Sequence, residues 1–219
     1  MKGILYAVGV GPGDPELLTL KAVRVIREAN VIACPSKDYT YGVAYNIALR
    51  ACPEIASKEK LLLDFPMKTG DITIAHKEAS ERITKFLEKG KSVAFLTLGD
   101  PEVYSTFSYF SDMVCEKGFE IEVISGITSF CAAAAGFNVP VSIGSEAVLI
   151  TAGEYRNFDG TLIIMKVGKK LVQIKEKIRE HGKKAWLVEN CGMPDEKFYY
   201  DIDSIPDTTS YFSLMIVKG

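Results

Sequence analysis

The sequence predicts an α/β protein with a parallel sheet in its N-terminal part and a mixed sheet in its C-terminal part. Strand-like and helix-like patterns alternate from the first residues to about residue 117, which is typical of a parallel sheet covered by helices on both faces. Beyond that point, five strand-like runs are separated by only two clear helices, which favours a mixed sheet. The length of 219 residues, of which 47% are hydrophobic, allows two small domains. We expect them to be residues 1–117 and 118–219.

The elements of the N-terminal part follow from hydrophobic periodicity and from the residues that end each run. The apolar run 4–8 predicts a buried strand, and Asp14 before a proline predicts the start of a helix over residues 15–29. Pro35 is expected to end the second strand, over residues 31–34. The other expected elements are a helix over 40–51, a strand at 61–63, a helix over 71–89 with Ile74, Ala79, Ile83, Phe86 and Leu87 facing inward, a strand over 92–97 and a helix over 104–117.

The C-terminal part has less regular spacing. Its two predicted helices lie near residues 128–136 and 169–181. Its predicted strands are 119–124, 147–151, 161–167, 184–189 and 212–217. Because several strands follow one another without a helix between them, antiparallel pairs are expected beside parallel ones.

Charge and cysteine content exclude several classes of protein. Lys and Arg number 26 against 28 Asp and Glu, so the net charge of −2 provides no general basic field for nucleic acid. The five cysteines are an odd number without a C-x-x-C pair, which indicates free thiols in a reducing compartment and no structural zinc site. The apolar run 4–10 is far shorter than the ~18 residues of a membrane span and is wrongly flanked for a signal peptide. We expect a cytoplasmic protein without a metal, membrane or nucleic-acid partner.

Histidine is scarce, which argues against the common hydrolytic and metal-dependent chemistries. The chain has two histidines, His76 and His181, in stretches that read as polar helices, so both are expected to be solvated. A Ser-His-Asp triad and a His-rich metal site are therefore disfavoured. Cys131 lies in a small-residue helix and is more typical of a core position than of a nucleophile.

Three loops follow predicted strands, where parallel sheets bind their ligands. Residues 9–14, GVGPGD, permit close approach of backbone N–H groups, but they match neither the dinucleotide fingerprint nor a P-loop, and a tight turn explains them equally well. In residues 98–101, LGDP, Asp100 is either part of a site or the N-cap of a helix. Residues 125–129, SGITS, lead into four alanines, which favour a closely packed core helix over a cofactor contact.

Together the three loops are far more specific than any one alone. Residues 8–22, VGVGPGDPELLTLKA, resemble the opening motif of the tetrapyrrole methylases, the S-adenosylmethionine-dependent enzymes of cobalamin and sirohaem synthesis. Residues 98–101 and 125–129 stand where that family has its second and third motifs. Residues 35–37, PSK, and 211–217, YFSLMIV, resemble the branch that methylates the C20 carbon of precorrin-2. The likeness covers essentially the whole chain.

The resemblance implies two α/β domains with both ligands in the cleft between them, and a homodimer as the usual assembly. Pro12 and its neighbours would line the trough for the polycarboxylate tetrapyrrole. The implied contacts of the methyl donor are Leu98, Gly99, Asp100, Val103, Tyr104, Thr128, Ser129, Met165, Lys166, Asn190 and Cys191. The implied substrate contacts are Gly11, Pro12, Gly13, Asp14 and Lys37.

One departure from the family pattern concerns the catalytic base. Sirohaem-forming relatives have an acid just after the second strand, where this chain has Pro35, so no catalytic base is assigned. The methyl donor is already an activated electrophile, and the enzyme chiefly has to align the reacting carbon and exclude water. Candidate cations for the substrate carboxylates are Lys21, Lys37, Arg156, Lys166 and Lys169, each of which would otherwise be an ordinary solvated charge.

The substrate expected from the resemblance is precorrin-2 or its cobalt complex, giving the corresponding precorrin-3. The compact length and the high Lys and Glu content favour a heat-adapted, anaerobic source and hence the cobalt complex. The alternatives are methylation of a different ring carbon, a diphthamide-type methylase acting on a protein, and a cofactor-binding module without chemistry.

Overall fold

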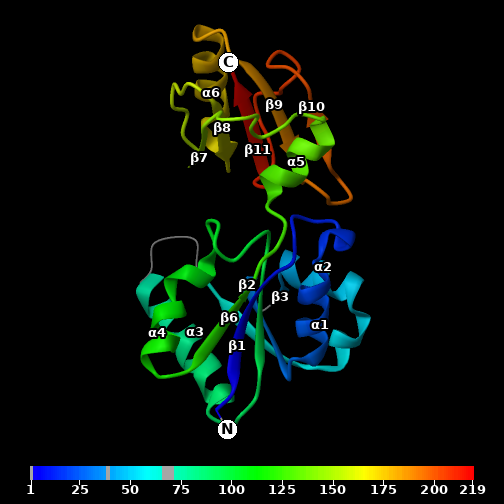
Figure 1. Ribbon diagram of the computed structural model, residues 1–219, viewed down its shortest axis with the longest axis vertical. Helices are drawn as coiled ribbons and strands as arrows, with labels where there is room; N and C mark the ends of the chain where they lie inside the picture. The colour runs from blue at the N-terminus through cyan, green and yellow to red at the C-terminus, as the bar shows by residue number, and fades with distance from the viewer. Residues whose placement is uncertain (1, 38–39, 66–71) are drawn as a thin grey trace. The chain divides into compact units, whose positions relative to one another are not determined.

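The computed structural model describes residues 2–37, 40–65 and 72–219, without the side chains of residues 37, 72 and 169. The chain divides into two compact units, Met1–Thr128 and Ser129–Gly219. The division falls 11 residues later than the boundary expected after residue 117. The reason is that β6 (Glu120–Ile124) pairs in parallel with β1 (Ile4–Gly9), so this strand completes the first sheet and does not begin the second (Figure 1).

The first unit contains the predicted parallel sheet. Its strand order is β3-β2-β5-β1-β6, and β4 also pairs with β2. Every pair is parallel except the short pair of β2 with β3. The remaining strands of this sheet are β2 (Val31–Lys37), β3 (Thr40–Tyr41), β4 (Glu59–Asp64) and β5 (Val93–Thr97).

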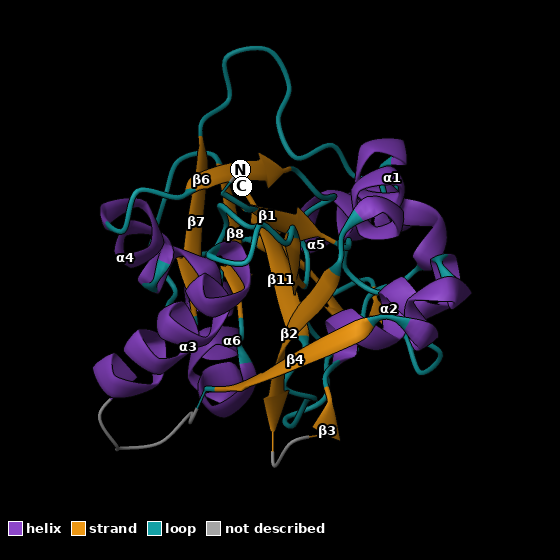
Figure 2. Ribbon diagram, turned by 90° about the horizontal axis from the view of Figure 1, so that it is seen from below, coloured by secondary structure: helices purple, strands orange, loops and turns teal. Residues whose placement is uncertain are grey.

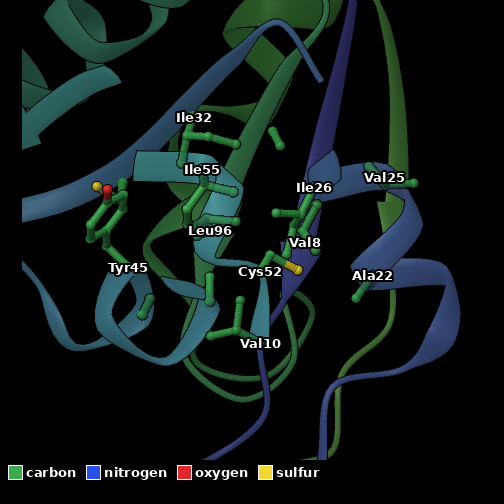
Figure 3. Close-up of a cluster of buried hydrophobic side chains, with 14 of the residues drawn as sticks. Val8, Val10, Ala22, Val25, Ile26, Ile32, Tyr45, Cys52, Ile55 and Leu96 are labelled. Atoms are coloured by element: carbon green, nitrogen blue, oxygen red, sulfur yellow. The ribbon is translucent and has the colours of Figure 1, made fainter. Parts of the chain in front are cut away.

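Helices cover both faces of this sheet, as the alternating pattern predicted. One face carries α1 (Leu20–Glu28) and α2 (Val43–Ala51), and the other carries α3 (Ile72–Leu87) and α4 (Ser111–Glu116) (Figure 2). In the core beneath α1 and α2, the side chains of Val8, Ile26 and Leu96 point toward one another (Figure 3). Burial of such aliphatic groups contributes about 1.5–3 kcal/mol for each side chain, which fixes the helices on the sheet.

The helix expected over 40–51 begins only at Val43, because residues 40–41 form β3. Two other helices are much shorter than predicted, because polar side chains cap 3-10 turns at their expected starts. Asp14 caps only a 3-10 turn over Pro15–Leu17, and α1 begins at Leu20, where the hydroxyl of Thr19 accepts a hydrogen bond from Ala22 N at 3.1 Å. The helix expected over 104–117 is a 3-10 turn over Thr106–Tyr109 followed by α4. These changes leave residues 10–14 and 98–105 as loops at the end of the sheet where β1 and β5 finish.

Three further expectations about the first unit are wrong. Pro35 does not end the second strand, which continues to Lys37. Proline is tolerated there because β5 pairs with β2 only as far as Ala33, so no hydrogen bond to β5 requires an N–H at Pro35. Ile74, expected to face inward on α3, is 52% exposed. His76, expected to be solvated, is only 7% exposed, because its ring stacks on Tyr109 at a centroid distance of 4.9 Å.

The second unit has the mixed sheet that the spacing predicted, in the order β10-β9-β11-β8-β7. Only β7 and β8 pair in parallel. The helices α5 (Ser129–Phe137) and α6 (Leu171–Glu180) pack on opposite faces of it. Its strands are β7 (Val148–Ala152), β8 (Thr161–Met165), β9 (Lys184–Glu189), β10 (Lys197–Tyr199), which the sequence did not predict, and β11 (Ser213–Lys218).

The cysteines are free thiols in both units. Cys34, Cys52 and Cys191 are buried. Cys131 is exposed, contrary to the expected core position, because it lies on the outer side of α5. None of the helices in the described ranges combines the length and apolar character needed to cross a membrane.

Candidate functional site

The first and second glycine loops are joined by a two-bond bridge between their main chains. Gly11 N donates to Gly99 O at 3.3 Å, and Gly99 N donates to Gly11 O at 2.8 Å. Both residues have positive φ, +73° and +72°, a conformation that glycine adopts without the steric cost of a Cβ. The pairing of β1 with β5 brings the loops together, because parallel neighbours finish at the same edge of the sheet.

The carboxylate of Asp100 connects the second loop to the third. Its Oδ2 accepts a hydrogen bond from Gly126 N at 2.9 Å, and its Oδ1 accepts one from Glu102 N at 2.8 Å. The second bond closes the turn after the loop, in which Val103 N donates to Asp100 O, and no helix begins there. Asp100 therefore connects two loops and is not the N-cap of a helix, which was one of the two roles that the sequence left open.

Three glycines pack together where these loops meet. A Cβ placed on Gly126 would lie 2.1 Å from Gly99 O, and one placed on Gly9 would lie 2.6 Å from the same oxygen. These contacts are with main chain, which no side-chain rotation relieves. The backbones of the three loops are thus in direct contact, and any larger residue at Gly9 or Gly126 would push them apart.

Gly99 is buried at this junction, yet there is open space beside the position that its Cβ would take. Apart from residues 98–100 themselves, no heavy atom of the described residues lies within 4 Å of the place where a Cβ of Gly99 would stand. Tyr104, which follows Val103 at the end of the turn, has a φ of +48° and is half exposed. A non-glycine residue in the left-handed region indicates a locally constrained backbone, which is common at functional sites.

The residues implied for the tetrapyrrole lie on the first unit, beside the junction. Pro12 and Gly13 separate the end of β1 from the turn at Pro15–Leu17, and the side chain of Asp14 accepts a hydrogen bond from Glu16 N at 2.9 Å. Lys37 is the last residue of β2, and its side chain is not among the parts that the structure describes.

The donor residues expected in the second unit lie at the ends of two strands that flank β11. Lys166 follows β8 and Asn190 follows β9, with φ values of +56° and +53°. Because β11 runs antiparallel to both, its beginning meets both strand ends: Lys166 N donates to Ser213 O at 2.9 Å, and Asn190 N donates to Phe212 O at 2.7 Å. Met165 and Cys191 are their chain neighbours, so the four predicted residues form one group.

The side chain of Asn190 makes two hydrogen bonds within the second unit. Its Nδ2 donates to Asp195 Oδ2 at 2.7 Å, and its Oδ1 accepts a hydrogen bond from Ser210 Oγ at 3.0 Å. Burial raises the pKa of the neighbouring Cys191 thiol to about 12, so this thiol is protonated at neutral pH and is no nucleophile. Asn190 thus helps to shape the loop.

Thr128 and Ser129 stand at the end of the first unit and at the start of α5, respectively. The hydroxyl oxygen of Thr128 is buried and has no hydrogen-bond partner among the described residues. A buried hydroxyl without a partner costs free energy, and a bound polar ligand could remove that cost.

Two of the candidate cations for a polycarboxylate already have acidic partners. Lys21 Nζ lies 2.6 Å from a Glu122 carboxylate oxygen, and an Arg156 nitrogen lies 3.1 Å from a Glu154 carboxylate oxygen; all four side chains are substantially exposed. Such exposed pairs contribute little, about 0–1 kcal/mol, and a stronger anion can replace the partner. Lys166 is exposed, and the side chains of Lys37 and Lys169 lie outside the described residues.

Sequence reasoning missed the polar residues behind these loops. Glu189 is buried at the end of β9, where it contacts Tyr199 and Ser210. An acid at the end of the otherwise apolar run 185–189 was the available signal. Within the described part of the chain, no group of three or more His, Cys, Asp and Glu side chains could hold a metal ion.

Comparisons with known proteins give a consistent result. A family model described as "Tetrapyrrole (Corrin/Porphyrin) Methylases" matches residues 4–205. A protein named probable cobalt-precorrin-2 C(20)-methyltransferase, from Methanocaldococcus jannaschii, is 35% identical, and the alignment covers 98% of this chain and 95% of that protein. The uroporphyrinogen-III C-methyltransferase of Bacillus subtilis is 34% identical over 83% of this chain and 72% of its own length.

A solved structure has the same fold. It is a uroporphyrin-III C-methyltransferase from Thermus thermophilus complexed with S-adenosylhomocysteine, with a TM-score of 0.72 and 22% identity. The match covers 99% of this chain and 92% of that one. At this identity the likeness establishes the architecture alone.

Proposed function

This chain belongs to the tetrapyrrole (corrin/porphyrin) methylase family, and we propose that it transfers a methyl group from S-adenosylmethionine to the C20 meso carbon of precorrin-2 or its cobalt complex. The observation that carries the proposal is the similarity to the Methanocaldococcus C(20)-methyltransferase, because it extends over 98% of this chain and 95% of that protein. That relative's name includes cobalt, so cobalt-precorrin-2 is the substrate we favour.

The described residues fit S-adenosylmethionine on three counts. Gly99 is buried at the junction of the glycine loops but has open space at its Cβ position, which leaves room for a ligand close to the backbone. Thr128 offers a buried hydroxyl without a partner. Lys166 and Asn190 have left-handed backbone conformations at the ends of the two strands that flank β11. The residues that would hold the donor are those implied by the family resemblance in both units.

Catalysis of this reaction mainly requires that the methyl group be aligned with the reacting carbon. When bound, S-adenosylmethionine supplies an activated methyl group on a good leaving group. The backbone-to-backbone contacts of Gly9, Gly99 and Gly126 make the first part of the donor site rigid, which reduces the entropy lost on alignment. Residues 11–14 and Lys37 would bind the tetrapyrrole, and cations would meet its carboxylates. We assign no residue to the removal of the proton from the reacting carbon.

The two units have separate roles in this proposal. The first would hold the tetrapyrrole and one side of the donor, and the second would complete the donor site from the ends of β8 and β9. We also propose that the protein is cytoplasmic and that it forms a homodimer. A sedimentation measurement would test the dimer.

A second candidate is methylation of uroporphyrinogen III. It is favoured by the 34% identity to the Bacillus subtilis enzyme, but that match covers only 83% of this chain. The family resemblance weighs against it, because sirohaem-forming relatives have an acid at the position of Pro35.

An anaerobic turnover assay separates the candidates. The purified protein is incubated with S-adenosylmethionine and, in parallel, with cobalt-precorrin-2, precorrin-2 and uroporphyrinogen III, and the methylated carbon is located by NMR. We expect methylation at C20, fastest with cobalt-precorrin-2. Turnover of uroporphyrinogen III alone would select the second candidate. Calorimetric binding of S-adenosylhomocysteine without methylation of any of the three would indicate a binding module or a different acceptor.

A further inference from the structure

The segment 205–213 lies between β10 and β11, ends at the first residue of β11, and contacts buried charged side chains at two places. The two charged side chains that are buried among the described residues of the second unit are Lys175, which is 5% exposed, and Glu189, which is 9% exposed. Both bind this segment. Charged groups are rarely buried unless they are paired and hydrogen-bonded, because burial of a charge costs free energy. The hydrogen bonds of this segment to Lys175 and Glu189 offset that cost.

Lys175 holds the beginning of the segment against α6. Its ammonium donates to Ile205 O at 2.5 Å and to Asp207 Oδ1 at 2.7 Å. A longer contact reaches Pro206 O at 3.4 Å. These contacts stabilise the fold of the second unit. They involve neither Lys166 nor Asn190.

Glu189 holds the other end of the segment. Its Oε2 accepts a hydrogen bond from Ser210 N at 2.8 Å, and its Oε1 accepts one from Tyr199 Oη at 3.0 Å. The hydroxyl of Ser210 in turn donates to Asn190 Oδ1 at 3.0 Å. The carboxylate of Glu189 is therefore one residue from Asn190 along the chain and is also connected to it through Ser210.

The residues after Ser210 reach the second half of the proposed donor site. Phe212 O accepts from Asn190 N, and Ser213 O accepts from Lys166 N. Asn190 and Lys166 both have positive φ, which for non-glycine residues costs of order 1 kcal/mol or more and persists only where the surroundings fix it. The carbonyl groups of Phe212 and Ser213, by accepting these hydrogen bonds, help to fix this conformation.

We propose that Glu189 is a positioning residue for the methyl donor. By holding Ser210 N, its carboxylate places the end of the 205–213 segment, and that segment sets the backbone of Lys166 and Asn190. Lys175 holds the same segment at its other end and stabilises the unit without reaching these residues. This inference rests on the proposed methyl-donor function.

The test compares variants of Glu189 with a control at Lys175. Glu189→Ala is expected to raise the Kd for S-adenosylhomocysteine by about 10- to 100-fold, as expected for loss of a charged hydrogen bond. Glu189→Gln should restore affinity to within about threefold, because the amide oxygen can accept from Ser210 N and the amide nitrogen can donate to the Tyr199 hydroxyl. Lys175→Met should lower the Tm while leaving the Kd within about threefold.

Kinetics and a milder variant separate positioning from folding. Ser210→Ala removes only the hydroxyl contact to Asn190, and we expect a rise of about threefold to tenfold in the KM for S-adenosylmethionine with an unchanged KM for the tetrapyrrole. It keeps the inference testable if Glu189→Ala does not fold. Unchanged donor affinity in the folded Glu189 and Ser210 variants, or an equal loss in Lys175→Met, would overturn the inference. Failure of the unaltered protein to bind S-adenosylhomocysteine would instead overturn the proposed function.

Discussion

Replacement of Gly126 by alanine tests whether the three glycine loops form one rigid junction. The added methyl group would lie 2.1 Å from Gly99 O and 2.9 Å from Gly9 Cα. Carbon and oxygen atoms in ordinary contact are more than 3 Å apart, so the loops must separate by about 1 Å. Because the obstructing atoms belong to the main chain, a change of rotamer cannot absorb this displacement.

The magnitude follows from the cost of overpacking. Inserting a methyl group into a well-packed site costs about 1–3 kcal/mol, and we take about 2 kcal/mol for Gly126→Ala. For a chain of this length, that corresponds to a fall in Tm of about 4–8 °C. A displacement of about 1 Å near the reacting groups is expected to lower turnover by about 100-fold.

The assay is thermal unfolding followed by circular dichroism, together with turnover of cobalt-precorrin-2. Gly168→Ala is a matched control, because Gly168 has no positive φ and no described heavy atom lies within 4 Å of its Cβ position. We expect the control to leave the Tm and turnover almost unchanged. If Gly126→Ala behaved like the control in both measurements, the contact between the three loops could not be as close as the structure has it.

The remaining predictions concern Asp100, the thiols and the buried histidine. Asp100→Ala should weaken S-adenosylhomocysteine binding by at least about tenfold in calorimetry, because Gly126 N loses a charged acceptor of about 1.5–3 kcal/mol. A thiol reagent at pH 8 should modify Cys115 and Cys131 quickly and the buried thiols slowly, since burial raises the pKa of Cys34 to about 12. Burial lowers the pKa of His76, so the unfolded chain binds its proton first and the free energy of unfolding should fall as the pH drops below 6.5.

Each of these predictions has a control. For Asp100→Ala, the control is Glu102→Gln, which keeps the hydrogen bond from the backbone N–H of residue 102 to Asp100. This variant should bind S-adenosylhomocysteine normally. All five thiols should react quickly in denaturant. His76→Phe keeps a ring against Tyr109 and should lose the pH dependence between 6.5 and the lower pKa of the folded state. A slope that persists in this variant would assign the effect to another group.

The parts of the fold that could be predicted were those set by local pattern. The apolar run 4–8 and the glycine loop after it gave β1 and its turn correctly, because strand burial and turn chemistry are encoded within a few residues. The sheet to which residues 120–124 belong could not be predicted, since pairing with β1 is a contact more than a hundred residues distant. The prediction that Pro35 ends the second strand was wrong for the same reason, since whether a strand tolerates proline depends on which strand lies beside it.

The candidate site divides along similar lines. The three loops were identified from their motifs, and the structure brings them together as adjacent strands require. Whether Asp100 was a cap or a site residue could not be settled from spacing, because its partner Gly126 lies 26 residues away and is reached only through the sheet. Glu189 was missed because a carboxylate at a strand end is ordinary until its two hydrogen-bond donors, which come from later in the chain, are known.

The place of β11 in the second sheet has a consequence for the order of folding during synthesis. All strands of the first sheet are made by residue 124, so that unit can begin to fold on the ribosome while the rest is translated. β11, residues 213–218, is the middle strand of the second sheet and separates β9 from β8. The second unit therefore has no continuous sheet until its last strand emerges, and the nascent chain carries a finished first unit beside strands that still lack a partner. That interval is when the protein is most exposed to aggregation and to proteases.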